Sequence, residues 1–182
     1  FLIIESIKDI DLKNIKKRNK FSIIYRNKNN LENISDLFNF RRLCKQKSIK
    51  FYIANNTNLA VLLKSDGIYL SAFNKTLRPL SLKKSNFTLI GSAHNLQEIT
   101  LKKIQGCKTI LFSKLFPVRY DEMAPYYGVV KFNNYLINNK NLIPLGGISI
   151  NNLNNLNNLN CEGFALLSEI KKKPAKIINR LF

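Results

Sequence analysis

The sequence predicts a (β/α)8 (TIM) barrel, an α/β fold, built as a single domain over residues 1–182. Short apolar runs alternate with amphipathic stretches from one end of the chain to the other, and a strict strand–helix alternation implies a parallel sheet. About eight such units are present, which is the number that closes a barrel. Because barrels usually need about 200 residues or more, a chain of 182 residues must have trimmed helices and loops.

Eight segments have the length and apolar character of buried strands. In chain order they are residues 2–5, 21–26, 51–54, 67–70, 87–92, 109–113, 142–145 and 163–167. The stretches between them carry apolar residues at helical spacing, which predicts helices over residues 11–20, 31–47, 58–64, 96–105, 129–138 and 169–181. The fourth connection, residues 71–86, is the least helical and is predicted to be mostly loop.

The seventh connection contains a low-complexity stretch, NNLNNLNNLN, over residues 151–160. Asparagine is a poor helix former and costs about 0.6 kcal/mol per site relative to alanine. A helix here must therefore be held by Leu153, Leu156 and Leu159 packing inward. We interpret this stretch as a solvated helix and assign it no function.

The formal net charge of +19 raises the question of a nucleic-acid partner, because phosphate backbones attract clusters of lysine. Lysine, asparagine and isoleucine are in excess together, and their codons are all A/T-rich. The basic residues are also spread along the chain rather than gathered in a tail. We therefore favour genome composition over nucleic-acid binding as the origin of the charge.

Neither a membrane protein nor a disulfide or zinc protein is indicated. No apolar run approaches the roughly 18 residues of a membrane span, and the apolar residues 1–4 are too few for a signal-peptide core. We therefore expect a cytoplasmic protein. Cys44, Cys107 and Cys161 are far apart and form no CxxC pair, which indicates small core residues.

Two strand ends carry signals for a phosphate site. In a barrel, phosphate commonly binds after the seventh and eighth strands. Gly146 and Gly147 follow the seventh predicted strand, where the lack of a Cβ lets backbone N–H groups approach an anion. Leu167 and Ser168 end the eighth, at the start of a predicted helix whose dipole favours negative charge. Together these signals predict a phosphate site at the mouth of the barrel.

Several motifs occur in an order and spacing typical of one enzyme family. They are SDGIYL at residues 65–70, GSAHN at 91–95, KLFP at 114–117, GGIS at 146–149 and EGFALLSEI at 162–170. In these motifs the chain resembles thiamine phosphate synthase and its thiazole tautomerase relatives, over nearly its whole length. Synthases of this family join a pyrimidine pyrophosphate to a thiazole phosphate and release pyrophosphate, with magnesium held by two aspartates.

The resemblance implies a set of substrate-binding residues. Arg26 and Lys28 match basic residues that contact pyrophosphate, and Asn55 matches an asparagine that contacts substrate. Ser92 matches a serine of the family's Ser-Ala-His motif. The residues that match the thiazole phosphate cradle are Gly147, Leu167 and Ser168.

The chain departs from the family at the metal and pyrophosphate positions. Asn56 and Asn74 stand where the magnesium aspartates are expected, and neutral amides weaken a site for a hard cation. Ile24 replaces a usual glutamine, and the threonine-rich pyrophosphate loop is replaced by VRYD at residues 118–121. The resemblance therefore implies no cofactor, or at most a weakly bound magnesium ion.

His94 is the single histidine of the chain. In the tautomerase branch, a histidine at the matching position moves protons on the thiazole, a role suited to a pKa near neutrality. Synthases often carry a histidine here too, and a lone histidine after a strand is more often a structural residue that hydrogen-bonds to backbone. The sequence therefore leaves catalysis by His94 open.

The interpretation we favour is a divergent synthase-like protein of thiamine biosynthesis. It would bind thiazole phosphate or thiamine phosphate, with weak or lost synthase activity. Three alternatives remain: a tautomerase-like isomerase that uses His94, a non-catalytic barrel that binds a phosphorylated ligand, and, least favoured, a basic nucleic-acid-binding module. The sequence does not decide between a monomer and a homo-oligomer.

Overall fold

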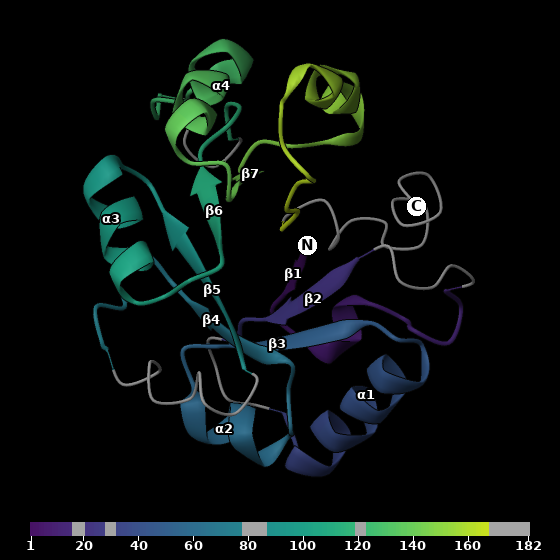
Figure 1. Ribbon diagram of the computed structural model, residues 1–182. Coiled ribbons are helices and arrows are strands. Elements are labelled where there is room, and N and C mark those ends of the chain that lie inside the picture. Colours follow the sequence, from purple (N-terminus) through teal and green to yellow (C-terminus); the bar gives the residue numbers. More distant parts are fainter. Residues whose placement is uncertain (16–20, 28–31, 78–86, 119–122, 168–182) are drawn as a thin grey trace.

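The fold is centred on a parallel sheet of seven strands that curls on itself, with helices on its outer side (Figure 1). The computed structural model describes residues 1–15, 21–27, 32–77, 87–118 and 123–167. The strands pair in chain order, each parallel to the next. They are β1 (Leu2–Ile4), β2 (Ser22–Tyr25), β3 (Lys50–Ala54), β4 (Gly67–Leu70), β5 (Thr88–Ala93), β6 (Thr109–Ser113) and β7 (Leu142–Leu145). All seven lie where the sequence predicts strands.

The two edges of the sheet approach each other through residues 165–166. Ala165 forms an isolated parallel bridge with Leu145 of β7, and Leu166 forms one with Leu2 of β1. The backbone hydrogen bond from Ile3 N to Leu166 O is 2.8 Å long. The predicted eighth strand, residues 163–167, is represented in the described residues by these two bridges rather than by a regular strand.

Four α-helices connect the strands in the described ranges. They are α1 (Ile34–Gln46), α2 (Thr57–Leu62), α3 (Leu96–Ile104) and α4 (Gly128–Asn138). The first three begin at an asparagine, Asn33, Asn56 or Asn95, whose side chain accepts a hydrogen bond from a backbone N–H of the first turn. The asparagine-rich composition thus supplies helix caps. The four helices confirm the predictions at these positions, whereas the one predicted at residues 169–181 lies outside the described residues.

The helix predicted over residues 11–20 is wrong in its described part. Residues 11–15 form bends and turns, preceded by a short 3-10 helix, η1 (Ile7–Asp9). The Asp11 carboxylate accepts hydrogen bonds from Lys13 N (2.9 Å) and Asn14 Nδ2 (2.6 Å). Such local side-chain bonds compete with helix formation. Leu12 and Ile15 are nevertheless buried, so the apolar spacing indicates core packing here and not a helix.

The asparagine-rich stretch forms a 3-10 helix, η3 (Ile150–Asn158), instead of the predicted α-helix. A 3-10 helix has three residues per turn, so leucines spaced by three lie along one edge. Leu159 is buried, and Leu153 and Leu156 pack against the core. Asn133 of α4 accepts a hydrogen bond from Asn160 N (3.2 Å). The NNL repeat thus matches the 3-10 period better than the α-helical one.

Each strand places alternate residues on two sides of the sheet. One set, typified by Ile3, Ile24 and Tyr69, forms a compact cluster in the interior of the curled sheet. The other set, typified by Ile4, Ile23 and Ile68, packs in a larger cluster that includes residues of the surrounding helices. Burial on both faces is expected of a parallel sheet covered by helices. Among the described residues, the helices lack the length and the apolar character of a membrane span.

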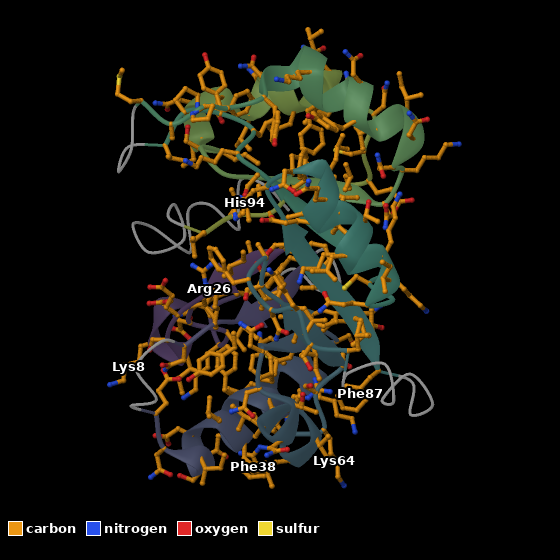
Figure 2. The ribbon with its side chains drawn as sticks, turned by 90° about the vertical axis from the view of Figure 1, so that its left-hand side faces the viewer. Lys8, Arg26, Phe38, Lys64, Phe87 and His94 are labelled. Atoms are coloured by element: carbon orange, nitrogen blue, oxygen red, sulfur yellow. The ribbon has the colours of Figure 1, made fainter. Side chains whose placement is uncertain are left out.

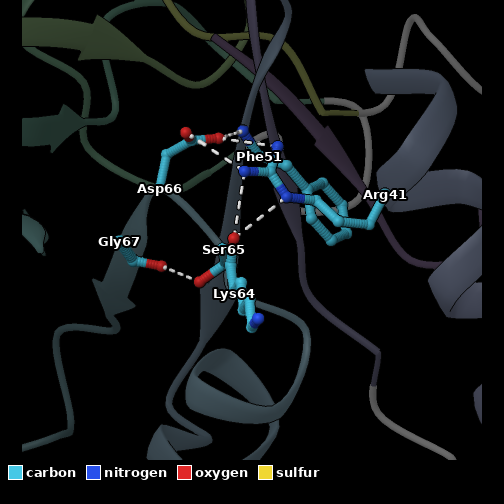
Figure 3. Close-up of polar contacts among 6 residues, drawn as sticks. All are labelled: Arg41, Phe51, Lys64, Ser65, Asp66 and Gly67. Atoms are coloured by element: carbon cyan, nitrogen blue, oxygen red, sulfur yellow. Dashed lines mark hydrogen bonds and ion pairs between the residues drawn. The ribbon is translucent and has the colours of Figure 1, made fainter. Parts of the chain in front are cut away.

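The SDGIYL motif has a structural role in the turn before β4 (Figure 3). The Asp66 carboxylate accepts a hydrogen bond from Phe51 N (2.7 Å) and pairs with Arg41 of α1 (3.0 Å), which also donates to Lys64 O. A Cβ on Gly67 would lie 1.9 Å from Thr88 O of β5, so only glycine permits this approach. The motif therefore joins α1, β3, β4 and β5.

The three cysteines are free thiols, as the sequence predicts. Cys44 and Cys107 are buried, and burial raises the pKa of the Cys44 thiol to about 12. Cys161 is only half-buried, which departs from the expected core position, and burial raises its pKa as well. The raised pKa values make Cys44 and Cys161 unsuited to act as nucleophiles at neutral pH.

Candidate functional site

A cavity of about 450 Å³ lies at the carboxyl ends of the strands. In parallel sheets surrounded by helices this end carries the binding sites, because the loops after the strands meet there. The polar and glycine residues of the lining lie at or just after the ends of five different strands. They are Glu5, Arg26, His94, Ser113, Lys114, Gly146 and Gly147. Figure 2 shows Arg26 and His94 on the same side of the molecule.

Gly146 and Gly147 form a tight turn after β7, with positive φ angles of 92° and 69°. Their carbonyl oxygens are used within the protein, since Gly146 O accepts from Phe116 N (3.1 Å) and Gly147 O from Asn152 Nδ2 (2.8 Å). Their N–H groups donate to no other described residue. The turn therefore offers two backbone donors at the cavity, as an anion site requires.

Leu167, which the sequence predicts to be part of the phosphate cradle, also lines this cavity. Ser168 and Lys28, the other predicted binding residues of the two strand ends, lie outside the described residues. The predicted phosphate site is thus represented here by Gly146, Gly147 and Leu167.

Arg26 extends from the end of β2 into the same cavity, where its side chain is about one quarter exposed. Its Nη2 lies 3.4 Å from the Glu5 carboxylate, a long and partly solvated ion pair. Within the described residues its Nε is buried and has no hydrogen-bond partner. A buried guanidinium donor left unpaired is the arrangement expected of a residue that binds an anionic ligand.

Ser92 does not line the cavity but lies beneath it, with 5% of its surface exposed. It forms a hydrogen bond with the hydroxyl of Tyr69, which is buried in the interior cluster and also hydrogen-bonds Arg26. Burial raises the pKa of Tyr69, opposed by these bonds and by the charge of Arg26. The Tyr69 hydroxyl therefore stays protonated and hydrogen-bonds Arg26 from the interior of the sheet.

His94 is held at three points. Its ring Nδ1 and Ser113 Oγ, 19 residues apart in sequence, share a hydrogen bond of 2.9 Å. Its backbone N donates to Glu98 Oε2 (2.7 Å), and its carbonyl accepts from the Tyr127 hydroxyl. The other ring nitrogen, Nε2, contacts no described hydrogen-bond partner. A histidine oriented through one nitrogen and open at the other is suited to proton transfer.

Asn55, Asn56 and Asn74 do not line this cavity. Asn55 Oδ1 accepts from Asn74 Nδ2 and from Ser71 N, both at 3.0 Å. Asn56 Oδ1 instead accepts from Leu59 N (2.9 Å) and caps α2. The structure therefore pairs Asn74 with Asn55 and not with Asn56.

Backbone carbonyls of the loop that carries Asn74 already bind a cationic group from α3. Lys102 of α3 is fully buried, and its ammonium donates to Ser71 O and Asn74 O, both at 2.7 Å. Burial lowers the pKa of Lys102, opposed by the thiol of Cys107 and the carboxylate of Glu98. Among the described residues no group of three or more His, Cys, Asp or Glu could hold a metal ion. At positions 55, 56 and 74 the side chains offer neutral amide oxygens rather than carboxylates.

Ser113, Glu5 and Tyr69 belong to the site but were not predicted from the sequence. Ser113 and Glu5 stand at or beside strand ends, which is a signal that could have found them. Tyr69 carries no such signal, because only the packing inside the sheet brings its hydroxyl to Arg26 and Ser92.

Comparisons with known proteins agree on one family. A family model described as thiamine monophosphate synthase matches residues 12–170. The thiamine-phosphate synthase of Geobacillus thermodenitrificans is 23% identical over 74% of this chain and 62% of its own length. That of Persephonella marina is 23% identical over 81% of this chain and 71% of its own length. A bifunctional thiamine biosynthesis protein, ThiED, of Geobacter sulfurreducens is 28% identical over 82% of this chain and 31% of that protein.

A solved structure named for a thiamine enzyme has a similar fold. The solved structure of thiamine phosphate pyrophosphorylase from Pyrococcus furiosus matches with a TM-score of 0.73, covering 100% of this chain and 95% of that chain at 15% identity. At this identity the likeness concerns the fold alone. The sequence match covers 159 residues, from 12 to 170, and includes most of the strand ends that form the cavity. The chain therefore belongs to the thiamine monophosphate synthase family.

Proposed function

We propose that this chain acts in thiamine biosynthesis and binds thiazole phosphate or thiamine phosphate in the cavity at the strand ends. The phosphate would accept hydrogen bonds from the N–H groups of Gly146, Gly147 and Ser168. One observation carries this proposal: a single cavity is lined by hydrogen-bond donors without a described acceptor. These donors are the backbone N–H groups of Gly146 and Gly147 and the Nε of Arg26. We also propose that residues 163–167 complete an eight-stranded barrel at the two bridges.

The synthase names of the relatives support a transferase that joins pyrimidine pyrophosphate to thiazole phosphate. In that reaction the thiazole nitrogen forms a bond to the pyrimidine methylene carbon, and the pyrophosphate leaves with the bonding electrons. Arg26, Lys28 and Lys114 would supply positive charge to the leaving group, which electrostatic stabilisation requires. We propose that this activity is weak, since the asparagines at positions 56 and 74 cannot replace two carboxylates.

One observation favours a second candidate, a thiazole tautomerase. The imidazole of His94 is oriented by Ser113 and lines the same cavity as the glycine turn. A proton shuttle and a phosphate anchor are the parts that such an isomerisation needs. This activity would not depend on a metal ion or on pyrophosphate-binding residues.

The binding proposal predicts a strong effect of Arg26→Gln. We expect thiazole phosphate to bind about 10–100-fold more weakly, because a hydrogen bond to a charged group contributes about 1.5–3 kcal/mol. Isothermal titration calorimetry measures the affinities. Arg42→Gln is the matched control, since Arg42 is an exposed residue of α1. An equal affinity of Arg26→Gln and the wild type, or ligand density away from the glycine turn, would contradict the proposal.

The second prediction concerns magnesium. We expect weak magnesium binding by the wild type and an affinity at least about tenfold higher in Asn56→Asp with Asn74→Asp, because charge count sets affinity for a hard cation. Aspartate at position 56 can still cap α2. The control is Asn154→Asp with Asn157→Asp, which makes the same change of charge at two exposed positions of η3 and should leave the magnesium affinity unchanged. Tight binding or robust magnesium-dependent synthase turnover by the wild type would show the inference to be wrong.

A further inference from the structure

A fully buried lysine holds the loop that follows β4. Lys102 belongs to α3, which packs against β5 (Figure 1), and its exposed fraction is 0%. Its ammonium donates hydrogen bonds to Ser71 O (2.7 Å), Asn74 O (2.7 Å) and Gln105 Oε1 (2.9 Å). Among the described residues no carboxylate forms an ion pair with it. The charge is therefore stabilised by neutral oxygens, two of which are backbone carbonyls of the loop.

The partners of Lys102 match the charged form of its side chain. An ammonium group has three N–H donors, whereas a neutral amine has two and a lone pair that needs a donor. All three partners are acceptors, one for each N–H group. If the loop moved away, a buried charge would lose two of its three partners, which is strongly unfavourable. The ammonium therefore couples the position of the loop to α3.

Gln105 holds the same loop from the end of α3. It is 1% exposed, and its Nε2 donates to Asn74 O (2.9 Å) and Thr76 O (2.7 Å). We call Lys102 and Gln105 the loop clamp. Gly91 of β5 leaves room for it, since a Cβ there would lie 2.8 Å from Lys102 Cδ. The lysine stem thus occupies the space that a side chain at position 91 would need.

The clamped backbone carries a network of amide groups at the end of the sheet where the cavity lies. Asn55 Oδ1 accepts from Ser71 N and from Asn74 Nδ2, and Asn55 Nδ2 donates to Ser71 Oγ (3.1 Å). Ser71 O accepts from Asn74 N (3.0 Å) as well as from Lys102. The Asn55 side chain is therefore oriented by two residues whose carbonyls the clamp binds.

We propose that Lys102 is a positioning residue, whose buried ammonium fixes the loop after β4 and thereby orients the side-chain amides of Asn55 and Asn74. Lys102 does not itself contact a ligand, because it is buried and does not line the cavity. A role of these amides in substrate binding rests on the proposed function, since only the family resemblance assigns Asn55 a substrate. The positioning itself can be measured without a ligand.

Lys102→Met tests the proposal because it keeps an apolar side chain and removes the ammonium. We expect the backbone N–H groups of Ser71 and Asn74 to exchange with solvent about tenfold faster or more, since the loop loses two hydrogen bonds to a charged donor. The NMR signals of the Asn55 and Asn74 side-chain amides should shift as well. Lys108→Met is the matched control, since it removes an exposed ammonium before β6 and should leave these signals unchanged.

The glycine turn after β7 separates positioning from a general loss of packing. In Lys102→Met the NMR signals of Gly146 and Gly147 should stay as in the wild type. The proposal is overturned if the loop of this variant exchanges like that of the wild type, or if the glycine signals change as much as the loop signals.

A measurement on the wild type covers the case in which Lys102→Met does not fold. The ammonium protons of Lys102 should exchange with water at least about tenfold more slowly than those of Lys108, because they are buried and hydrogen-bonded. They should also give nuclear Overhauser effects to protons of Ser71 and Asn74. Equal exchange of the two ammonium groups would overturn the proposal.

Calorimetric titration of Asn55→Ala with pyrimidine pyrophosphate and with thiazole phosphate tests the substrate role separately. If Asn55→Ala weakens the binding of either compound, Lys102→Met should weaken the same binding about 3–10-fold, and an unchanged affinity in Lys102→Met would overturn its role in binding. If Asn55→Ala binds both compounds like the wild type, the substrate role of Asn55 fails. The amide signals then still decide whether Lys102 positions Asn55.

Discussion

Gly147→Ala is expected to lower the free energy of unfolding by about 2–5 kcal/mol, the combined effect of a left-handed backbone and a forced contact. Gly147 has a φ of 69°, and a Cβ there would lie 2.4 Å from Phe116 O and 2.5 Å from Pro117 O. Both contacts are with backbone, which cannot move aside as a side chain can. A larger residue such as valine at this position would therefore damage the fold as well as fill the space of an anion.

Alanine substitutions at two other glycines separate the cost of the left-handed backbone from the cost of the forced contact at Gly147. Gly128 has a φ of 67° but open space where a Cβ would lie, so Gly128→Ala should cost only the backbone term of about 1–2 kcal/mol. Gly163 has open space and no positive φ, so Gly163→Ala should stay within about 0.5 kcal/mol of the wild type. Urea denaturation measures all three. If Gly147→Ala is no less stable than Gly128→Ala, the close approach of the Phe116 backbone is not present in solution.

Any tautomerase activity of the wild type on thiazole phosphate is expected to fall about 100-fold or more in His94→Asn, the usual contribution of a positioned acid–base group. The His94 ring lines the cavity at the strand ends and offers Nε2 to a ligand there. Asparagine keeps a polar group near Ser113 but has no imidazole that could accept and donate a proton. The measurement is the rate of thiazole phosphate tautomerisation in the two proteins.

Ser113→Ala serves as the comparison for this experiment. It removes the 2.9 Å hydrogen bond to Nδ1 and leaves the imidazole in place, so a smaller loss of rate is expected than in His94→Asn. Both variants should keep the affinity for thiazole phosphate within a few-fold, about 1 kcal/mol or less. Equal rates in His94→Asn and the wild type would assign His94 a structural role, in which its ring and backbone join β5, β6 and α4 through Ser113 and Tyr127.

The strands were predictable because their signal is local. Every strand from β1 to β7 lies within one residue of its predicted bounds at each end, since a short apolar run between polar breakers fits a buried parallel strand. The glycine turn at Gly147 followed from the same pattern, because it comes after a strand and parallel strands end at one edge, whereas Arg26 and His94 were named from the family resemblance. The resemblance to the synthase family added the ligand that such a cavity would bind.

Sequence by itself therefore determined the order of the strands, the end of the sheet that carries the cavity and the residues at its glycine turn. The tertiary structure alone decided which side chains meet there. His94 meets Ser113 across 19 residues, Ser92 reaches Tyr69 below the cavity, and Asn74 pairs with Asn55 and not with Asn56. It also decided that residues 11–15 and the asparagine-rich stretch are not α-helical. The reason is physical: apolar spacing reports which residues are buried, whereas hydrogen bonds between distant side chains depend on how the buried surfaces pack.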